Sequence, residues 1–441
     1  MFQKAPHPTT PESTTNSRAT GYERGWRNEG DRATIARVRV EKPVPSIRSH
    51  LVVSGATDVS TYGPPRTPVT LVMPPTLVAD VGQDTFRLGR SGESCPSVAF
   101  PVQSGGDGGA MVDGLVADWD QLEKLWERGL ASEALGLGVE DAPLSLVLAE
   151  PWFNKRSLHQ KYVELMFEKF GVGSLFSCKT AVLCCYANGR TTGLAVEAGE
   201  TMTCTVPIHE GFIMQAGANR SSIGGGALTQ AMRLDLEGGN RARGEWGDAA
   251  AVGTARAVKE GYCSVSPSRL AGADGGGGGG GAGSGGGEGE AKAMDVEDSR
   301  TGTAAAEGTF TLPDGKTLVV PGGPHKVPEL LFDSDAAGVS RYPGAVALQD
   351  MVLFSVSKCD LTLRKDLFAN IVLGGGTSAF DGLPARLTSE VTECVGGAER
   401  VRVLAAAPEA RTSSAWIGGS IIVRGWVSVC RARVCGCVVV W

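Results

Sequence analysis

The stretch from Phe176 to Cys204, FSCKTAVLCCYANGRTTGLAVEAGETMTC, contains an apolar run that ends in a carboxylate and a glycine turn. A strand that ends this way places backbone N–H groups at the tip of the turn, where they can hold a phosphate. Alone, such a turn is weak evidence, because a glycine after a strand usually only reverses the chain. An apolar run followed by a glycine turn occurs three times, at Thr76–Val81 before Gly82, at Thr192–Ala198 before Gly199 and, without a carboxylate, at Ala369–Leu373 before Gly374–Gly376. Two such turns that face each other would clamp a polyphosphate from two sides.

The composition is that of an ordinary globular chain. Its 441 residues allow two or three domains, and 42% of them are hydrophobic. The formal charge of -6 gives no reason to expect a polyanionic partner along the whole surface. The 11 cysteines include no CxxC pairs, so most are expected to be buried hydrophobes rather than metal ligands. They fit a reducing compartment, and the apolar C-terminal stretch is interrupted by too many arginines to span a membrane.

Composition also divides the chain into five segments. Residues 1–70 form a basic, Pro-rich tail that is expected to be disordered, with nine Lys/Arg against five Asp/Glu in its first 50 residues. Residues 265–308 are Gly-rich and then acidic, which predicts a disordered linker or insertion. Periodic apolar patterning occupies residues 71–264 and 309–423, and residues 424–441 form a divergent tail with no helical period.

Two helices are predicted between the strand–glycine turns. Asp118 can cap a helix over Trp119–Leu130, and a second helix is predicted over Leu158–Phe170 with Gly171 as its stop. Their apolar stripes are expected to be core, and consist of Leu122, Leu125, Trp126 and Leu130 in the first helix and Tyr162, Leu165, Met166 and Phe170 in the second. Strands that alternate with helices predict an α/β fold with a mostly parallel sheet.

Several segments resemble the actin family, in the same order along the chain. They are VADVGQDTFRLGRSGE, AVLCCYANGRTTGLAVEAGETMT, VPIHEGF, FTLPDGKTLVV, PELLF, CDLTLRKDLFANIVLGGGTSAFDGLPARL and SSAWIGGSI, and they cover residues 76–422 apart from the Gly-rich insertion. The segments AEPWFNKR, FSCKTAVL and VPIHEGFIMQAG are similar to the nuclear, BAF-type actin-like subgroup of chromatin-remodelling and histone acetyltransferase complexes. The resemblance implies an actin-like two-lobed ATPase-type clamp, built from duplicated ribonuclease H-like domains, with ATP and Mg²⁺ in the cleft.

The resemblance also implies which residues line that cleft. Asp80, Gly82 and Gln83 fall on the first phosphate loop, with Arg87 at its basic residue. The second loop and the adenosine side are matched by Glu197, Gly199, Glu200, Lys259, Glu260, Gly375, Gly376, Thr377 and Phe380.

The chain departs from actins at several of these positions. Actins place the attacking water with a glutamine and a histidine, where this chain has Thr180 and Cys204. Neither reproduces the reach or hydrogen bonding of the lost pair, so hydrolysis is expected to be very slow or absent. Further changes bear on binding: Gln83 replaces a serine, Asp84 and Thr201 replace glycines, and Glu197 replaces an aspartate. The charge of Asp84 is expected to weaken polyphosphate binding unless a metal lies between them.

The surface of the resembling region is altered as well. After Pro101 only a short Gly-rich link, VQSGGDGGAMVD, stands where actins place the small subdomain that contacts the next protomer of a filament. This reduced subdomain argues against polymerisation. The C-terminus after Ile421 is expected to be truncated or divergent, which would leave an apolar seam of the first lobe exposed.

The resemblance favours a non-polymerising, nuclear actin-related scaffold subunit that binds ATP weakly or structurally with little or no hydrolysis. Its expected partners are actin or another actin-related protein, and a long helix of a remodelling motor or acetyltransferase-complex scaffold subunit. Nucleosomes or histones are further candidates, and a membrane is not. The alternatives are a cytoskeletal actin-like ATPase, a sugar kinase or chaperone ATPase of the same fold, and a degraded gene product without a stable fold. The sequence leaves open which complex is involved and whether ATP is bound at all.

Overall fold

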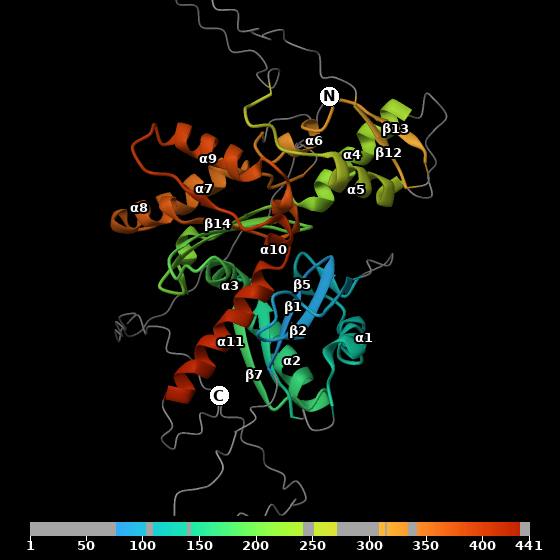
Figure 1. Ribbon diagram of the computed structural model, residues 1–441. Coiled ribbons are helices and arrows are strands. Elements are labelled where there is room, and N and C mark those ends of the chain that lie inside the picture. Colours follow the sequence, from blue (N-terminus) through green and yellow to red (C-terminus); the bar gives the residue numbers. More distant parts are fainter. Residues whose placement is uncertain are drawn as a thin grey trace, which may run out of the picture. The chain divides into compact units, whose positions relative to one another are not determined.

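Two β-sheets with corresponding strand orders form the framework of the protein (Figure 1). The computed structural model describes residues 76–102, 109–138, 143–240, 251–270, 308–313, 315–333 and 342–432, with residues 251 and 424–432 described by their backbone alone. The predicted tail 1–70, the Gly-rich stretch of the insertion and the last residues of the chain lie outside these ranges. The described residues belong to one compact unit, Val69–Trp441.

The first sheet has the order β3-β2-β1-β6-β7, and with the elements packed on it we call it the first lobe. Its strands are β1 Thr76–Val81, β2 Thr85–Arg90, β3 Val98–Pro101, β6 Ser145–Glu150 and β7 Ser174–Lys179. A small hairpin of β4 Met111–Val112 and β5 Leu115–Val116 lies between β3 and the helices that follow.

The second sheet has the order β10-β9-β8-β14-β15, and with the elements packed on it we call it the second lobe. Its strands are β8 Gly193–Ala198, β9 Thr203–His209, β10 Phe212–Ile213, β14 Ile371–Gly374 and β15 Val403–Leu404, and β11 Asn219–Ser221 pairs with β9. A separate hairpin consists of β12 Gly308–Thr311 and β13 Thr317–Val320.

Both sheets are mixed, so the prediction of a mostly parallel sheet is wrong. In each sheet the first three strands pair antiparallel, and the two later strands join in parallel. The reason is local, because strands joined by a tight turn pair antiparallel, whereas a parallel pair needs a longer crossover. The repeated order is the duplication that the actin resemblance implies.

Helices pack against both sheets. Those of the first lobe are α1 Trp119–Leu130 and α2 Arg156–Glu164. Those of the second lobe are α4 Gly225–Asn240, α5 Ala251–Tyr262, α6 Lys326–Glu329, α7 Leu348–Ser357, α8 Leu361–Ala369, α9 Leu383–Cys394 and α10 Pro408–Thr412. The first α1 turn has the predicted cap, since Asp118 Oδ1 accepts the backbone N–H groups of Asp120 and Gln121 at 2.9 and 3.0 Å.

The second predicted helix of the first lobe is divided in two. α2 ends at Glu164, and a π-helical turn over Leu165–Lys169 continues it. The helical segment then ends where predicted, before Gly171, whose positive φ of 61° favours glycine. The stripe is core as expected: Tyr162 is buried, and its hydroxyl accepts a hydrogen bond from Trp126 Nε1 at 2.7 Å.

The core of the second lobe draws on residues from both sides of the Gly-rich insertion. Cys263 precedes the predicted insertion 265–308, and Leu318 and Val327 follow it. Val265 is the first residue of that range and is buried with them, so the prediction that the disordered insertion begins at residue 265 is wrong. All four are buried in one cluster that also contains Ile371 of the central strand β14. The chain before and after the insertion therefore belongs to the same lobe.

Two helices carry the chain between the lobes, and they contact each other (Figure 1). α3 Thr180–Ala187 leads from β7 to β8, and α11 Ser414–Ala432 returns from the second lobe to pack on β1. A Cβ added to Gly418 would lie 1.9 Å from the carbonyl oxygen of Leu183, so glycine is required where the helices cross. Trp416 is fully buried and donates from Nε1 to the Val78 carbonyl at 2.9 Å, which fixes α11 to the first sheet.

The course of α11 corrects one expectation about the C-terminus. The sequence after Val423 has no recognisable helical period, yet the backbone stays helical to Ala432. This segment contains no proline and a single glycine, so nothing in it interrupts the hydrogen-bond ladder that α11 has already begun. Ile421, with 44% of its surface exposed, is the apolar residue of this helix that is open to solvent among those whose side chains are described.

Candidate functional site

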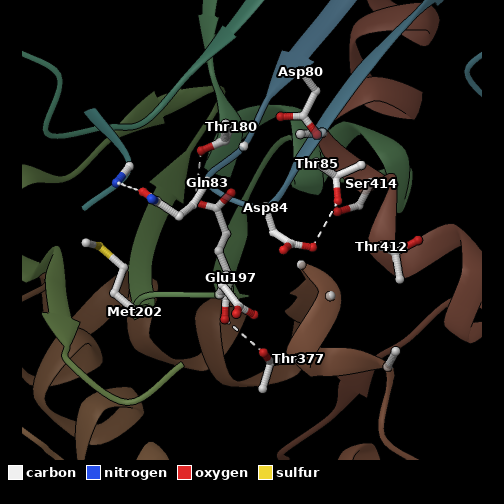
Figure 2. A pocket seen from close by; sticks show the side chains of 18 of the residues that line it. Asp80, Gln83, Asp84, Thr85, Thr180, Glu197, Met202, Thr377, Thr412 and Ser414 are labelled. Atoms are coloured by element: carbon white, nitrogen blue, oxygen red, sulfur yellow. Dashed lines mark hydrogen bonds between the residues drawn. The ribbon is translucent and has the colours of Figure 1, made fainter. Parts of the chain in front are cut away.

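One cavity of about 710 Å³ lies between the two lobes (Figure 2). Its floor is formed where β1, β8 and β14 end, and ligands of α/β proteins bind at such carboxyl ends of strands. Every residue that the resemblance assigned to nucleotide contact lines it: Asp80, Gly82, Gln83, Arg87, Glu197, Gly199, Glu200, Lys259, Glu260, Gly375, Gly376, Thr377 and Phe380. Thr180 and Cys204 line it as well. The structure thus brings together all predicted site residues, and their contact with a nucleotide stays a prediction.

The first turn connects β1 to β2. The backbone N–H of Gly82 donates to the Thr85 carbonyl at 3.0 Å, which closes the turn. Asp80 sits at the end of β1 opposite Arg87, whose Nη1 lies 3.5 Å from Asp80 Oδ2. Burial raises the pKa of Asp80, and the nearby guanidinium of Arg87 offsets only part of that effect. A carboxyl in this state gains from any cation that enters the cavity.

Gln83 uses its side chain to hold the β4–β5 hairpin. Its Nε2 donates to the Met111 carbonyl at 2.6 Å, and its Oε1 accepts the backbone N–H of Gly114 at 3.1 Å. Both ends of the amide are therefore occupied by backbone groups of the hairpin. The residue that replaces the serine of actins connects the first turn to the reduced subdomain, a role that the sequence reasoning missed.

The second turn connects β8 to β9 and carries a second buried carboxylate. Glu197 accepts hydrogen bonds from Thr180 Oγ1 at 3.1 Å and from Cys184 Sγ at 3.6 Å (Figure 2). Burial raises the pKa of Glu197 to about 7, the two hydrogen bonds oppose the rise, and the charge of Asp80 adds to it. Asp80 and Glu197 thus face one cavity from the two lobes and repel each other.

The positions of the water-placing residues have an apolar surrounding. The Thr180 hydroxyl is engaged by Glu197, and burial raises the pKa of Cys204 to about 12, so its thiol is neutral. Trp152 and Phe153 pack edge to face, with ring centroids 5.6 Å apart, and belong with Cys204 to one hydrophobic cluster. Neither Thr180 nor Cys204 can accept a proton from water in this arrangement.

The adenosine side combines a buried lysine with the third glycine turn. Lys259 is 5% exposed and donates from Nζ to the Gly225 carbonyl at 3.1 Å and to Thr229 Oγ1 at 2.9 Å. Burial lowers the pKa of Lys259, although the charge of Glu200 opposes this. Gly375 has a φ of 88°, and a Cβ there would lie 2.3 Å from the Ala198 carbonyl oxygen, so only glycine lets the β14 turn rest on β8.

The remaining predicted residues of this side close the ring around the cavity. Thr377 donates from Oγ1 to the Gly199 carbonyl at 2.8 Å, which joins the third turn to the second. A Cβ on Gly376 would meet nothing within 4 Å, so this glycine borders open space. Glu260 is largely exposed, and its Oε1 lies 3.9 Å from Lys259 Nζ.

Arg256 is a site residue that the sequence reasoning missed. Its Nη1 lies 2.6 Å from Asp84 Oδ1, and its Nη2 lies 2.7 Å from Glu200 Oε1. Helical spacing could have identified it, because Arg256 precedes Lys259 by three residues and Glu260 by four on α5. Residues at these spacings lie on the same face of a helix. The charge of Asp84, expected to oppose a polyphosphate, is balanced here by the guanidinium of Arg256.

Comparison with known proteins assigns the chain to a family. A profile of the actin family, described as Actin, matches residues 108–424. The chain is also 31% identical over 324 residues to a protein of Arabidopsis thaliana named Actin-related protein 4, and this alignment covers 70% of the chain and 72% of the relative. The chain belongs to the actin family.

Membership of the actin family makes the cavity part of a nucleotide-binding fold. The lining residues fit such a ligand with a divalent cation. Asp80 and Glu197 supply two oxygen-bearing groups at one spot, and Mg²⁺ is usually held by one or two carboxylates together with phosphate oxygens and water. Gly82, Gly199 and Gly376 all line the cavity, and Gly376 has open space beside its backbone. In the described part of the chain, no group of three or more His, Cys, Asp or Glu side chains could hold a metal by itself.

None of the described helices is both long enough and apolar enough to cross a membrane.

Proposed function

We propose that this actin-family protein is a non-polymerising scaffold subunit of nuclear chromatin-remodelling or histone acetyltransferase complexes. It holds ATP with Mg²⁺ in the cavity between its lobes as a structural ligand and hydrolyses it little or not at all. The observation that carries this proposal is the setting of Thr180 and Cys204, since the cavity that would hold the nucleotide has no proton acceptor at the two positions where actins place the attacking water.

A second feature of the cavity supports the binding of ATP without its hydrolysis. Trp152, Phe153 and Met202 contribute apolar surface beside Cys204, so a water molecule there would find few hydrogen-bond partners. When the attacking water is fully oriented, its positioning lowers the activation barrier of hydrolysis by several kcal/mol. Loss of that orientation does not itself abolish binding, because Asp80, Glu197 and the glycine turns line the cavity.

The reduced subdomain supports the absence of polymerisation. Between Pro101 and Trp119 the described chain contains the two-residue strands β4 and β5, and the backbone of this hairpin is held by Gln83. The resemblance implies that actins place there the subdomain whose loop contacts the next protomer. A hairpin of this size offers little of that contact surface.

The nuclear role rests on the subgroup motifs and on the relative named Actin-related protein 4. The proposed partners are actin or another actin-related protein, and a long helix of a remodelling motor or of an acetyltransferase-complex scaffold subunit. Nucleosomes or histones are the further proposed contact. An amphipathic helix laid in an apolar groove is the recognition mode that such a helix would use.

A single-turnover experiment with the full-length chain tests the nucleotide proposal. Phosphate release is followed with the protein in excess over γ-labelled ATP with Mg²⁺, and the melting temperature is measured separately with saturating unlabelled ATP. We expect a higher melting temperature, since a ligand at 100 times its Kd adds about 2.7 kcal/mol, and phosphate release near the uncatalysed rate. Release as fast as that of filamentous actin would favour the cytoskeletal alternative.

The complex is tested separately by affinity purification from nuclei. Recovery of a remodelling motor together with actin would support the scaffold role. Recovery of filament-capping or motility proteins would contradict it, whatever the outcome of the nucleotide experiment.

A further inference from the structure

The guanidinium of Arg256 joins two turns that belong to different lobes. One Nη contacts Asp84 in the β1–β2 turn of the first lobe, at 2.6 Å, and the other contacts Glu200 in the β8–β9 turn of the second lobe, at 2.7 Å. Arg256 itself lies on α5 of the second lobe. The ion pair with Asp84 therefore joins the two lobes beside the cavity, which Asp84 and Glu200 line.

Both turns are fixed in their own lobes, so the ion pair connects two rigid points. The Asp84 carbonyl accepts the backbone N–H of Val102 at 2.8 Å, and the other carboxylate oxygen of Asp84 accepts from Thr85 Oγ1 at 3.3 Å. The Glu200 carbonyl accepts the backbone N–H of Gly226 at 2.7 Å. Movement of the lobes away from each other would therefore have to break the ion pair between Asp84 and Arg256.

We propose that Asp84, Arg256 and Glu200 form an ionic latch that holds the two lobes together beside the cavity without any ligand and slows the exit of a bound nucleotide. The effect on nucleotide exit rests on the proposed function, whereas the closing of the ligand-free protein does not. The chemistry is that of one arginine shared by two carboxylates, a geometry suited to the planar guanidinium and not to lysine. Glu260 and Lys259 are the other charged groups that face Arg256 on α5.

The latch is weak enough to open. The side chains of Arg256 and Asp84 are 35% and 39% exposed, so water and salt compete with the pair. Screening by added salt should loosen it, because exposed charges lose most of their attraction at high ionic strength. Nucleotide exit from the wild-type protein should accordingly accelerate with ionic strength.

Asp84→Asn in the full-length protein separates this proposal from simple charge repulsion. If Asp84 only repels the polyphosphate, removing its charge slows the release of a fluorescent ethenoadenosine triphosphate with Mg²⁺. If Asp84 latches the lobes, the same change speeds release by about threefold to fivefold, the range of a partly exposed ion pair. The salt dependence of release should also diminish in the variant. Slower release, or release with an unchanged rate, would overturn the latch.

Hydrogen exchange of the ligand-free protein tests the latch without any nucleotide. The backbone amides of Gly82, Gly199 and Gly226 should exchange about threefold faster in Asp84→Asn, whereas the amide of Val372 in the buried strand β14 should not change. Arg233→Gln is the matched control, because it removes an ion pair with Glu237 that lies within α4. Equal exchange in Asp84→Asn and the wild type would refute the latch even if nucleotide binds. Faster exchange in a protein that binds no nucleotide would uphold the latch and refute the proposed function.

Discussion

Replacing Glu197 by glutamine should change how the stability of the ligand-free protein depends on pH. Glu197 is buried between the lobes, and burial raises its pKa from the ordinary 4.5 to about 7. Between these two values the folded protein binds a proton that the unfolded chain has released. The free energy of unfolding must therefore fall as the pH rises through this window, and it stops falling above the folded-state pKa.

The size of the effect follows from the two pKa values. A pKa of about 7 in place of 4.5 corresponds to roughly 3 kcal/mol of stability, most of which is lost between about pH 5 and pH 8. Glutamine keeps the shape of the side chain and carries no charge at any pH, but its single amide oxygen can accept from only one of Thr180 Oγ1 and Cys184 Sγ, which contact different oxygens of Glu197. The loss of the other hydrogen bond does not depend on pH in this range, so the slope of stability with pH remains the diagnostic quantity. Relative to the wild type, Glu197→Gln should gain about 2–3 kcal/mol on going from pH 5 to pH 8.

Denaturant unfolding of both proteins at several pH values in this range measures the difference directly. Glu150→Gln is a suitable control, because Glu150 is buried but has a lowered pKa. Burial tends to raise that pKa, and the hydrogen bond from His159 together with Lys179 outweighs it. Glu150 is ionised in both folded and unfolded chains above about pH 5, so its carboxyl adds no slope there. Parallel curves for wild type and Glu197→Gln would refute the reasoning about the cavity.

Three further predictions concern side-chain contacts in the two lobes. Gln83→Ala removes two hydrogen bonds to the β4–β5 hairpin and should cost about 1–3 kcal/mol, with faster hydrogen exchange of Met111 and Gly114 but no change in α9. Arg386 Nη2 lies 2.6 Å from Glu329 Oε1, and both residues are buried. Arg386→Met leaves the Glu329 carboxylate buried without its cation and should lower the free energy of unfolding by about 3–5 kcal/mol. A much smaller loss in denaturant titration would show that water reaches the pair. Thr180→Gln should destabilise the protein by about 1–3 kcal/mol, because the longer side chain enters the space of the Glu197 carboxylate, and Glu197→Asp should restore part of that loss in a double-mutant cycle by thermal unfolding.

The sequence was sufficient for the features that depend on local patterns. Thr76–Val81 is a strand with the predicted limits, and α1 begins and ends where the Asp118 cap and the apolar stripe place it. The lining of the cavity was predicted from the resemblance, because its residues stand in turns whose position along the chain the motifs define. These predictions needed no knowledge of how distant segments meet.

The missed contacts of Arg256 and Gln83 join residues that are far apart in the sequence, and the length of α11 is not reported by periodicity either. Arg256 lies far from Asp84 in the sequence, and only the folded lobes bring its guanidinium to that carboxylate. The sequence shows only that Gln83 replaces the serine of the first phosphate turn. In the folded protein its side-chain amide donates a hydrogen bond to the Met111 carbonyl in the β4–β5 hairpin. The continuation of α11 beyond Val423 was missed because periodicity reports which face is buried and not whether a helix can continue.

The two departures at Thr180 and Glu197 are best understood as one change. A glutamate extends one methylene further than the aspartate of actins, and here that reach brings the carboxylate to 3.1 Å from the Thr180 hydroxyl. The shorter threonine leaves the room that the longer acid requires, so each substitution is accommodated by the other. Their bond joins the first residue of α3 to the strand β8, where the chain passes from one lobe to the other. The position that in actins orients a water molecule thus serves here to tie the crossing helix to the second lobe. If the proposed function is right, a variant able to hydrolyse ATP would need both positions to change together, and Cys204 with them.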